Sequence, residues 1–265
     1  MADQAGLRRG DPLALSEAHV QVWCLSLERP PEELALFFSL LSPDEKAHAE
    51  RFYFEKNRDQ YAVGRGLLRT LLGGYLGEEP ARIGFAYGPH GKPALATAGR
   101  ERSLEFNLSH SGNLAIYAFS WGRRLGIDLE RVRPMPDEDR FADRFFSARE
   151  SALVRSLAGD GKLAAFFTIW TCKEAVLKAD GDGLAKPINE TEVSLSEGEP
   201  VRLVSVDGDQ EQAAHWRLET FAPAPGYQAA LAVEGEDWEF ALQPDGQPGE
   251  TWRQQNNRPA RKGSG

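Results

Sequence analysis

The order of helical and extended patterns along this 265-residue chain predicts an α+β fold. Helical periodicity dominates from Leu34 to about Leu72 and gives way to extended signals from Ile83 to Glu130. Helices then return from about Pro136 to Ala179, and strand patterns follow between Glu192 and Val233. Each half therefore combines helices with an antiparallel sheet, and the junction falls near Trp121–Leu125.

The first half opens with a strand and continues with three helical segments. The strand is expected at His19–Leu27, where the apolar residues favour one face. A helix through Leu41 follows a proline pair, and Ser42–Glu45 then has the Ser-Pro-x-Glu pattern of a capping box. The third helix is expected from about Asn57 to Leu72, ended by Gly73-Gly74.

Three arginines share one side of this third helix. Arg58, Arg65 and Arg69 fall at positions i, i+7 and i+11, which lie on one stripe of an α-helix. A solvated basic stripe is one interpretation, and an anion-binding face is the other.

The second half begins with a turn and repeats the helix-then-strand order. Trp121–Arg124 predicts a hairpin turn into the strand Leu125–Glu130, and Ser147–Glu150 predicts a second capping box. The residues after Gln243 lack periodicity and are predicted to be disordered. The expected later strands are Glu192–Ser196, Val201–Val206, Trp216–Phe221 and Tyr227–Val233.

Composition restricts the function classes and the compartment. The net charge of −9 disfavours general nucleic-acid binding, so anionic ligands would need local basic patches. Cys24 and Cys172 form no CxxC pair, and the first ten residues lack an apolar leader segment. The longest apolar stretch near the start, Leu34–Phe38, is too short to span a bilayer. We therefore expect a cytoplasmic protein that does not associate with membranes.

Two carboxylates one residue apart form the first candidate site. On a strand, Asp128 and Glu130 share one face, while Ile127 and Leu129 share the other. A wet acidic strand face explains this pattern without any ligand. A Mg²⁺ site is the alternative, since Mg²⁺ takes one or two carboxylates and completes its shell with water and phosphate oxygens.

A charged pair on an otherwise apolar helix forms the second candidate site. Glu174 and Lys178 are four residues apart, which is the spacing of an ordinary surface ion pair. Apolar residues precede the pair, at Phe166–Trp170, and Gly181–Gly183 follows it. Such an apolar helix is an unusual place for a purely solvated pair, so a cleft-facing role is an equal alternative.

A cluster of hydrogen-bonding side chains forms the third candidate site. The strand-like segment ending in Asn107–Gly112 contains Ser109 and His110. A structural histidine in a turn is the commoner explanation. A phosphate site would use the same hydroxyl, imidazole and backbone N–H donors.

Taken in order, these motifs resemble those of the 4′-phosphopantetheinyl transferases, specifically the two-halved type that activates surfactin-synthetase-like and other carrier proteins. A Gly-Lys-Pro turn at Gly91–Pro93 is also in the position that this family uses. Four motifs in the right order are much more specific than any one of them. The motifs are Asn-Leu-Ser-His at 107–110, Gly-Ile-Asp-Leu-Glu at 126–130, Phe-Phe-Ser-Ala-Arg-Glu at 145–150 and Trp-Thr-Cys-Lys-Glu-Ala-Val-Leu-Lys at 170–178.

The resemblance implies a monomeric pseudo-dimer of two similar α+β halves with coenzyme A bound in the cleft between them. The expected segments are a disordered N-terminus at 1–18, halves at 19–122 and 123–243, and a disordered tail at 244–265. It also implies transfer of the 4′-phosphopantetheine arm of coenzyme A to a serine of an apo acyl or peptidyl carrier protein.

The resemblance further implies roles for individual residues. Asp128, Glu130 and Glu174 would bind Mg²⁺, Glu174 would also act as the base, Lys178 would offset charge on the leaving group, and Asp128 would belong to the catalytic set. The implied coenzyme-binding residues are His48, Arg51, Arg65, Lys92, Pro93, Asn107, Ser109, His110, Lys173 and Lys178. Where relatives place a basic residue this chain has His48, and Lys46 and Arg51 are nearby substitutes.

Two other functions use the same residues. A Mg²⁺-dependent nucleotide or coenzyme A pyrophosphatase would hydrolyse its substrate without a protein acceptor. A non-catalytic homologue would bind carrier proteins only. The presence of all three carboxylates and Lys178 argues against the second alternative.

Overall fold

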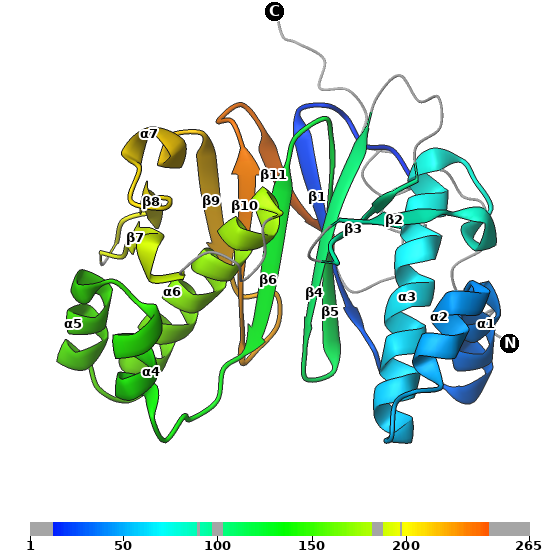
Figure 1. Cartoon of the computed structure of the whole chain (residues 1–265), viewed down its shortest axis with the longest axis horizontal. Helices are drawn as coiled ribbons and strands as arrows, with labels where there is room; N and C mark the ends of the chain where they lie inside the picture. Colours follow the sequence, from blue (N-terminus) through cyan, green and yellow to red (C-terminus); the bar gives the residue numbers. More distant parts are fainter. Residues whose placement is uncertain (1–12, 89–90, 97–102, 182–187, 197, 244–265) are drawn as a thin grey trace, which may run out of the picture. The chain divides into compact units, whose positions relative to one another are not determined.

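The structure is a computed structural model that describes residues 13–88, 91–96, 103–181, 188–196 and 198–243 (Figure 1). These residues form two compact units, each described by itself. The helical unit contains 13–15, 26–83 and residue 243, and the mixed unit contains 16–25 and 84–242 wherever these are described. Of the predicted disordered segments, residues 1–12 and 244–265 lie outside the described residues.

Three α-helices build the helical unit. They are α1 (Pro31–Leu40), α2 (Pro43–Ala49) and α3 (Glu55–Leu76), followed by the short 3₁₀ helix η1 (Pro80–Arg82). Helix α1 lies directly on α3, since a Cβ added to Gly66 would be 2.5 Å from the Cβ of Phe37. The glycine is therefore required by close helix packing.

The predicted end of the third helix is wrong. Helix α3 continues through Gly73-Gly74 and ends at Gly77, whose φ of 64° gives the left-handed C-cap. Gly73 is needed for a different reason: a Cβ there would be 2.7 Å from the carbonyl oxygen of Glu78. Close approach of the following loop, and not helix termination, explains this glycine.

The mixed unit contains antiparallel sheets and helices, which confirms the α+β class. A four-stranded sheet has the order β11-β1-β5-β4, and a three-stranded sheet has the order β6-β10-β9. Two further strand pairs are β2-β3 and β7-β8. The strands are β1 (His19–Ser26), β2 (Phe85–Tyr87), β3 (Pro93–Leu95), β4 (Leu104–Ser111), β5 (Leu114–Trp121), β6 (Leu125–Arg131), β7 (Glu192–Ser194), β8 (Arg202–Ser205), β9 (Trp216–Phe221), β10 (Tyr227–Glu234) and β11 (Glu239–Gln243).

The helices of the mixed unit are α4 (Glu138–Phe145), α5 (Ala148–Ser156), α6 (Gly159–Asp180), the 3₁₀ helix η3 (Ile188–Glu190) and α7 (Gln210–Ala213). Three of them, α4 to α6, lie in the predicted helical stretch, whereas η3 and α7 were not predicted. The capping box of α5 is confirmed, since the backbone N–H of Ser147 donates to Oε2 of Glu150 at 2.7 Å and the N–H of Glu150 donates to the Ser147 hydroxyl.

Two strand predictions require correction. Trp121–Arg124 does not close a hairpin, because β5 pairs with β4 and β6 pairs with β10 in another sheet. The turn instead carries the chain from one sheet to the next. Strand β11 was not predicted, and it joins β1 at the edge of the four-stranded sheet. The similarity of the two halves and their boundaries stay predictions.

Helix α6 and strand β6 form the contact that positions the candidate site. A Cβ added to Gly126 on β6 would lie 2.1 Å from the carbonyl oxygen of Ala175 and 2.3 Å from the backbone nitrogen of Ala179. Only glycine allows this approach. On its other side, β6 contributes Leu125, Ile127 and Leu129 to a buried core shared with β1, β5 and β10.

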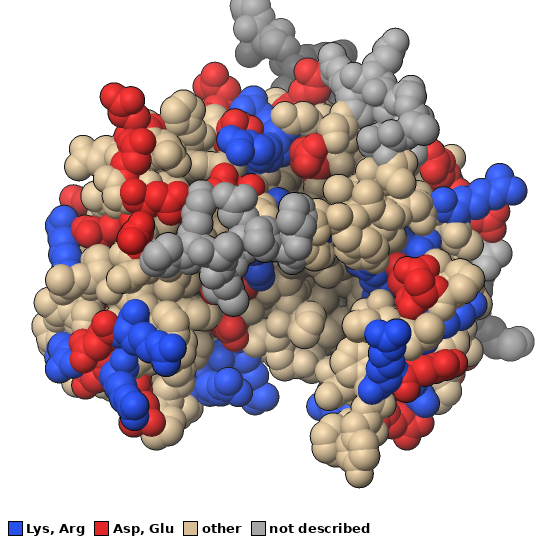
Figure 2. All heavy atoms as spheres, viewed as in Figure 1, with Lys and Arg blue, Asp and Glu red and all other residues tan. Residues whose placement is uncertain are grey.

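Three surface and core features bear on the earlier expectations. No helix among the described residues has the length and apolarity that crossing a membrane requires. Cys24 and Cys172 are buried and form no disulfide. On the face shown in Figure 2, acidic and basic side chains are interspersed over the described residues.

Candidate active site

Strands β4 and β6 and helix α6 bring together most of the predicted site residues. Neighbouring positions on the two strands face each other: Ser109 bonds to Asp128, and Ser111 bonds to Glu130. Both strands place alternate residues on one face, so the two serine–carboxylate contacts repeat with period two. Helix α6 adds Glu174 and Lys178, one helical turn apart.

Asp128 is the centre of the hydrogen-bonded part of the site. Its Oδ1 accepts from the Lys178 ammonium at 2.6 Å and from the Ser109 hydroxyl at 2.9 Å. Lys178 also donates to the Ser109 hydroxyl at 3.0 Å and to the carbonyl of Ile127 at 3.3 Å. Asp128 is only 4% exposed, and its second oxygen, Oδ2, is buried without a hydrogen-bond partner. A buried carboxylate oxygen without a partner can bind a cation or accept a hydrogen bond.

Glu130 is held by two side chains that were not among the predicted site residues. The Ser111 hydroxyl donates to its Oε2 at 2.9 Å, and the Trp170 side chain hydrogen-bonds to it as well. Burial is the main cause that raises the pKa of Glu130 above its usual value, and the nearby Asp128 charge also raises it. The i, i+2 relation of Ser111 to Ser109 is a signal that could have identified Ser111.

Glu174 lies beside these carboxylates. Burial raises the pKa of Glu174, and the charges of Asp128 and Glu130 raise it further, while Lys178 opposes them. Glu130 and Glu174 have raised pKa values because each is buried and lies near other carboxylates, and such a site favours a cation. The effects of the Asp128 charge on Glu130 and Glu174 support the prediction that these residues share one site.

The three carboxylates fit Mg²⁺ by donor type. Within the described part of the chain, no group of three or more His, Cys, Asp or Glu side chains is already arranged as a metal site. The unpartnered Oδ2 of Asp128 and the raised pKa values of Glu130 and Glu174 fit a set of hard oxygen donors for a divalent cation. Assignment of Mg²⁺ stays a proposal.

Asn107 and His110 have different positions on β4. Asn107 is 5% exposed, and its side-chain oxygen accepts from the backbone N–H of Ile127 at 2.9 Å. It therefore joins β4 to β6 inside the unit. His110 is exposed in part. Its partial desolvation is the main cause that lowers its pKa, and the Lys178 charge lowers it further. This histidine can contact a ligand mainly in its neutral form.

Lys173 and Lys92 have protein partners where the resemblance implied coenzyme contacts. Lys173 is completely buried and forms an ion pair with Glu150 at 2.7 Å. The Lys92 ammonium donates to the carbonyls of Leu125 and Ala179, each at 3.3 Å, and to that of Lys178. It thus caps the end of α6, and burial lowers its pKa. Geometry supports structural roles for both lysines.

The other predicted coenzyme contacts are distributed between the two units. Pro93 opens β3 in the mixed unit and pairs with Tyr87. His48 on α2 and Arg51 just after it are exposed parts of the helical unit, and His48 packs against Tyr61 with ring centroids 4.8 Å apart.

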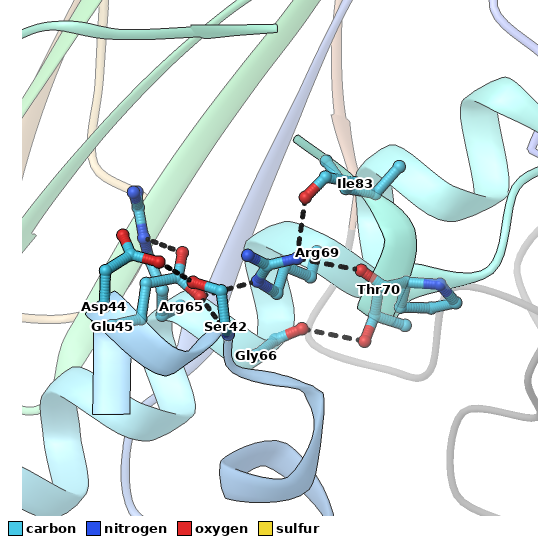
Figure 3. A network of polar contacts seen from close by, with 9 residues as sticks. Ser42, Asp44, Glu45, Arg65, Gly66, Arg69, Thr70 and Ile83 are labelled. Atoms are coloured by element: carbon cyan, nitrogen blue, oxygen red, sulfur yellow. Dashed lines mark hydrogen bonds and ion pairs between the residues drawn. The ribbon is translucent and has the colours of Figure 1, made fainter. Parts of the chain in front are cut away.

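Arg65 also belongs to the helical unit, but it is buried. Figure 3 shows that Arg65 and Arg69 both point toward Glu45, with Nε–oxygen distances of 2.8 Å each. Glu45 is 2% exposed and also accepts from the backbone N–H of Ser42 at 2.9 Å. A solvated basic stripe is therefore wrong for Arg65 and Arg69. Of the three arginines, only Arg58 partly fits a solvated basic stripe, and it bonds to Glu55 and Asp59 on its own helix.

Comparison with known proteins identifies the family. Residues 124–232 match the model of the 4′-phosphopantetheinyl transferase superfamily, and residues 28–121 match the model of the 4′-phosphopantetheinyl transferase N-terminal region. The 4′-phosphopantetheinyl transferase HetI of Nostoc sp. is 43% identical over 90% of this chain and 98% of that protein. The chain therefore belongs to the 4′-phosphopantetheinyl transferase superfamily, which confirms the predicted family and enzyme class.

A more distant sequence relative agrees with this assignment. The 4′-phosphopantetheinyl transferase Sfp of Bacillus subtilis is 27% identical over 83% of this chain and 94% of that protein. The solved structure of a holo-(acyl-carrier-protein) synthase from Bacillus anthracis is 19% identical, covers 42% of this chain and 93% of its own, and superposes with a TM-score of 0.35. The assignment depends on the sequence relatives, because that structural score is low.

Proposed function

We propose that the cluster of Asp128, Glu130, Glu174 and Lys178 is the catalytic centre of a phosphopantetheinyl transfer. The donor is coenzyme A, the acceptor is a serine hydroxyl of an apo acyl or peptidyl carrier protein, and the second product is adenosine 3′,5′-bisphosphate. The observation that supports this role is the contact of Lys178 with Asp128 at 2.6 Å, together with the effect of the Lys178 charge on Glu130 and Glu174, in a chain of this family.

The reaction replaces a pyrophosphate P–O bond with a P–O bond to the serine. Negative charge develops on the bridging oxygen that leaves with the nucleotide, so a cation placed at that oxygen lowers the barrier. Lys178 is the candidate, because its ammonium is fixed by Asp128 and Ser109 and remains partly exposed. Glu174 takes the serine proton, directly or through water, since it is the carboxylate of α6 on the same side as Lys178.

Asp128, Glu130 and Glu174 would hold Mg²⁺ in this proposal. Bound Mg²⁺ supplies positive charge beside the pyrophosphate and removes the repulsion among the three carboxylates. The protein side of the site keeps its geometry through the two serine contacts on β4 and through Trp170 on α6.

We further propose that the nucleotide end of coenzyme A contacts His110 and Pro93 in the mixed unit. The exposed edge of His110 and its lowered pKa favour a neutral hydrogen-bonding role. In the helical unit, Arg51 is exposed, whereas Arg65 is paired with Glu45. A monomeric state and a cytoplasmic location stay predictions.

The test is an incubation of the purified chain with coenzyme A, Mg²⁺ and an apo carrier protein, with the carrier weighed by intact mass spectrometry. We expect a mass gain of one phosphopantetheine that disappears with EDTA and in Glu174→Gln. Asp160→Asn is the matched control, because Asp160 is an exposed carboxylate on the same helix.

The other outcomes separate the alternatives. Coenzyme A that is consumed without any carrier would indicate the pyrophosphatase. If fatty-acid, polyketide and peptidyl carriers are all tested, and carrier binding occurs without a mass gain, the chain would be the non-catalytic homologue. A Glu174→Gln variant with wild-type transfer would refute the role of this residue.

A further inference from the structure

A buried ion pair lies one residue away from the proposed base. Lys173 of α6 is 0% exposed, Glu150 of α5 is 2% exposed, and the Lys173 ammonium is 2.7 Å from Oε2 of Glu150. Neither group takes part in the proposed chemistry. The pair therefore needs an explanation other than contact with substrate.

Both charged groups have three polar partners each. Besides Glu150, the Lys173 ammonium donates to the carbonyl of Ile188 at 3.2 Å and to that of Thr191. Glu150 accepts from the backbone N–H of Val193 at 2.8 Å, in addition to the N–H of Ser147. The pair thus joins α5, α6, η3 and β7 at one point.

Such a pair restricts the orientation of its side chains more than it stabilises the fold. Desolvation of two buried charges offsets most of their attraction, and replacement by apolar side chains of similar volume is often neutral. Each hydrogen bond, by contrast, restricts where the Lys173 side chain can point. Fixing Lys173 fixes the rotation of α6 about its own axis.

Helix geometry transmits this restriction to the site. Successive residues of an α-helix are about 100° apart around the axis, so the direction of Lys173 sets that of Glu174. Lys178 is four residues after Glu174 and shares its face. Contact between Gly126 and α6 limits the distance of the helix from β6, whereas the Glu150–Lys173 pair limits its rotation.

We propose that Glu150 and Lys173 are positioning residues that orient Glu174 and Lys178 toward Asp128 and Glu130. This inference rests on the proposed roles of Glu174 and Lys178. It gives the pair a function in turnover and not in coenzyme binding.

The experiment replaces both charges at once, with Glu150→Leu combined with Lys173→Met, and measures transfer kinetics and thermal unfolding. We expect an unfolding midpoint close to that of the wild type, a kcat reduced at least tenfold, and an unchanged KM for coenzyme A. A merely structural pair would leave kcat unchanged at temperatures well below the midpoint. Wild-type kcat in a folded double variant would overturn the proposal.

A single variant covers the case in which the double variant does not fold. Lys173→Met leaves Glu150 with two backbone donors, so the same fall in kcat is expected. If neither variant folds, the pair is a folding element and the proposal is wrong. Lys162→Met is the matched control. It removes the ion pair of Lys162 with Asp139, 2.8 Å apart, three turns earlier on α6, and this variant should keep wild-type kcat.

Glu174→Gln, assayed in parallel, distinguishes failure of the proposed base from failure of the proposed positioning role. Wild-type turnover in Glu174→Gln would refute the proposed base itself. Loss of turnover there, together with wild-type turnover in the double variant, would refute only the positioning role.

Discussion

Gly126→Ala tests whether the site depends on the contact between β6 and α6. The added Cβ would lie 2.1 Å from the carbonyl oxygen of Ala175 and 2.3 Å from the nitrogen of Ala179, whereas ordinary contact begins at 3.4 Å. Both obstructing atoms belong to the helix backbone, so no side chain can rotate away. The strand and helix must therefore separate, and Asp128 and Glu130 move relative to Glu174.

The magnitude follows from this separation. A displacement of about 1 Å in a catalytic arrangement lowers the rate by about 100-fold, and overpacking of this kind destabilises by about 1–3 kcal/mol. We expect kcat for carrier modification to fall by about that factor, with a lower unfolding midpoint, measured by intact mass spectrometry and denaturant titration.

Gly161→Ala is the matched control for this substitution. Gly161 is also on α6, nothing lies within 4 Å of its added Cβ, and alanine is the better helix former. We expect wild-type kcat and equal or slightly higher stability. Wild-type kcat and stability in Gly126→Ala would refute the reasoning, because they would mean that the close contact is not needed.

Three further predictions address the remaining charged groups. Arg69→Met should destabilise the chain by about 3–5 kcal/mol in denaturant titration, because it leaves the buried Glu45 with one guanidinium fewer. Arg58→Gln on the same helix should leave the unfolding midpoint unchanged, and an equal loss of stability in the two variants would contradict this account. Because the folded state lowers the pKa of His110, the unfolded chain binds more protons just below the usual value of 6.5. Stability should therefore rise as pH increases up to 6.5 and level off above it, and His110→Gln should weaken that rise; an identical pH profile would show that the histidine is unperturbed. Lys178→Met should lower kcat by about 100- to 1,000-fold with little change in KM for the carrier, and a change in KM alone would assign this lysine to binding.

Local patterns in the sequence predicted most of the secondary structure and which acidic side chains share a face. The Ser147 capping box, the alternation of Asp128 and Glu130, and the Glu174–Lys178 spacing all depend on residues within one helical turn or a few strand positions. Such patterns are readable because backbone periodicity alone decides which side chains share a face. Ordered motifs then added the family, which spacing alone did not give.

Only tertiary structure decided the partners of the charged residues and the strand pairing. The sequence did not show that Arg65 bonds to Glu45, that Lys92 caps α6, or that Lys173 is buried against Glu150. It also did not show that β11 joins β1 or that the turn after β5 leads into another sheet. These outcomes depend on which distant segments meet, and a distant partner leaves no mark on local periodicity. A lysine next to a catalytic motif therefore looks the same in sequence whether it faces a ligand or a buried glutamate.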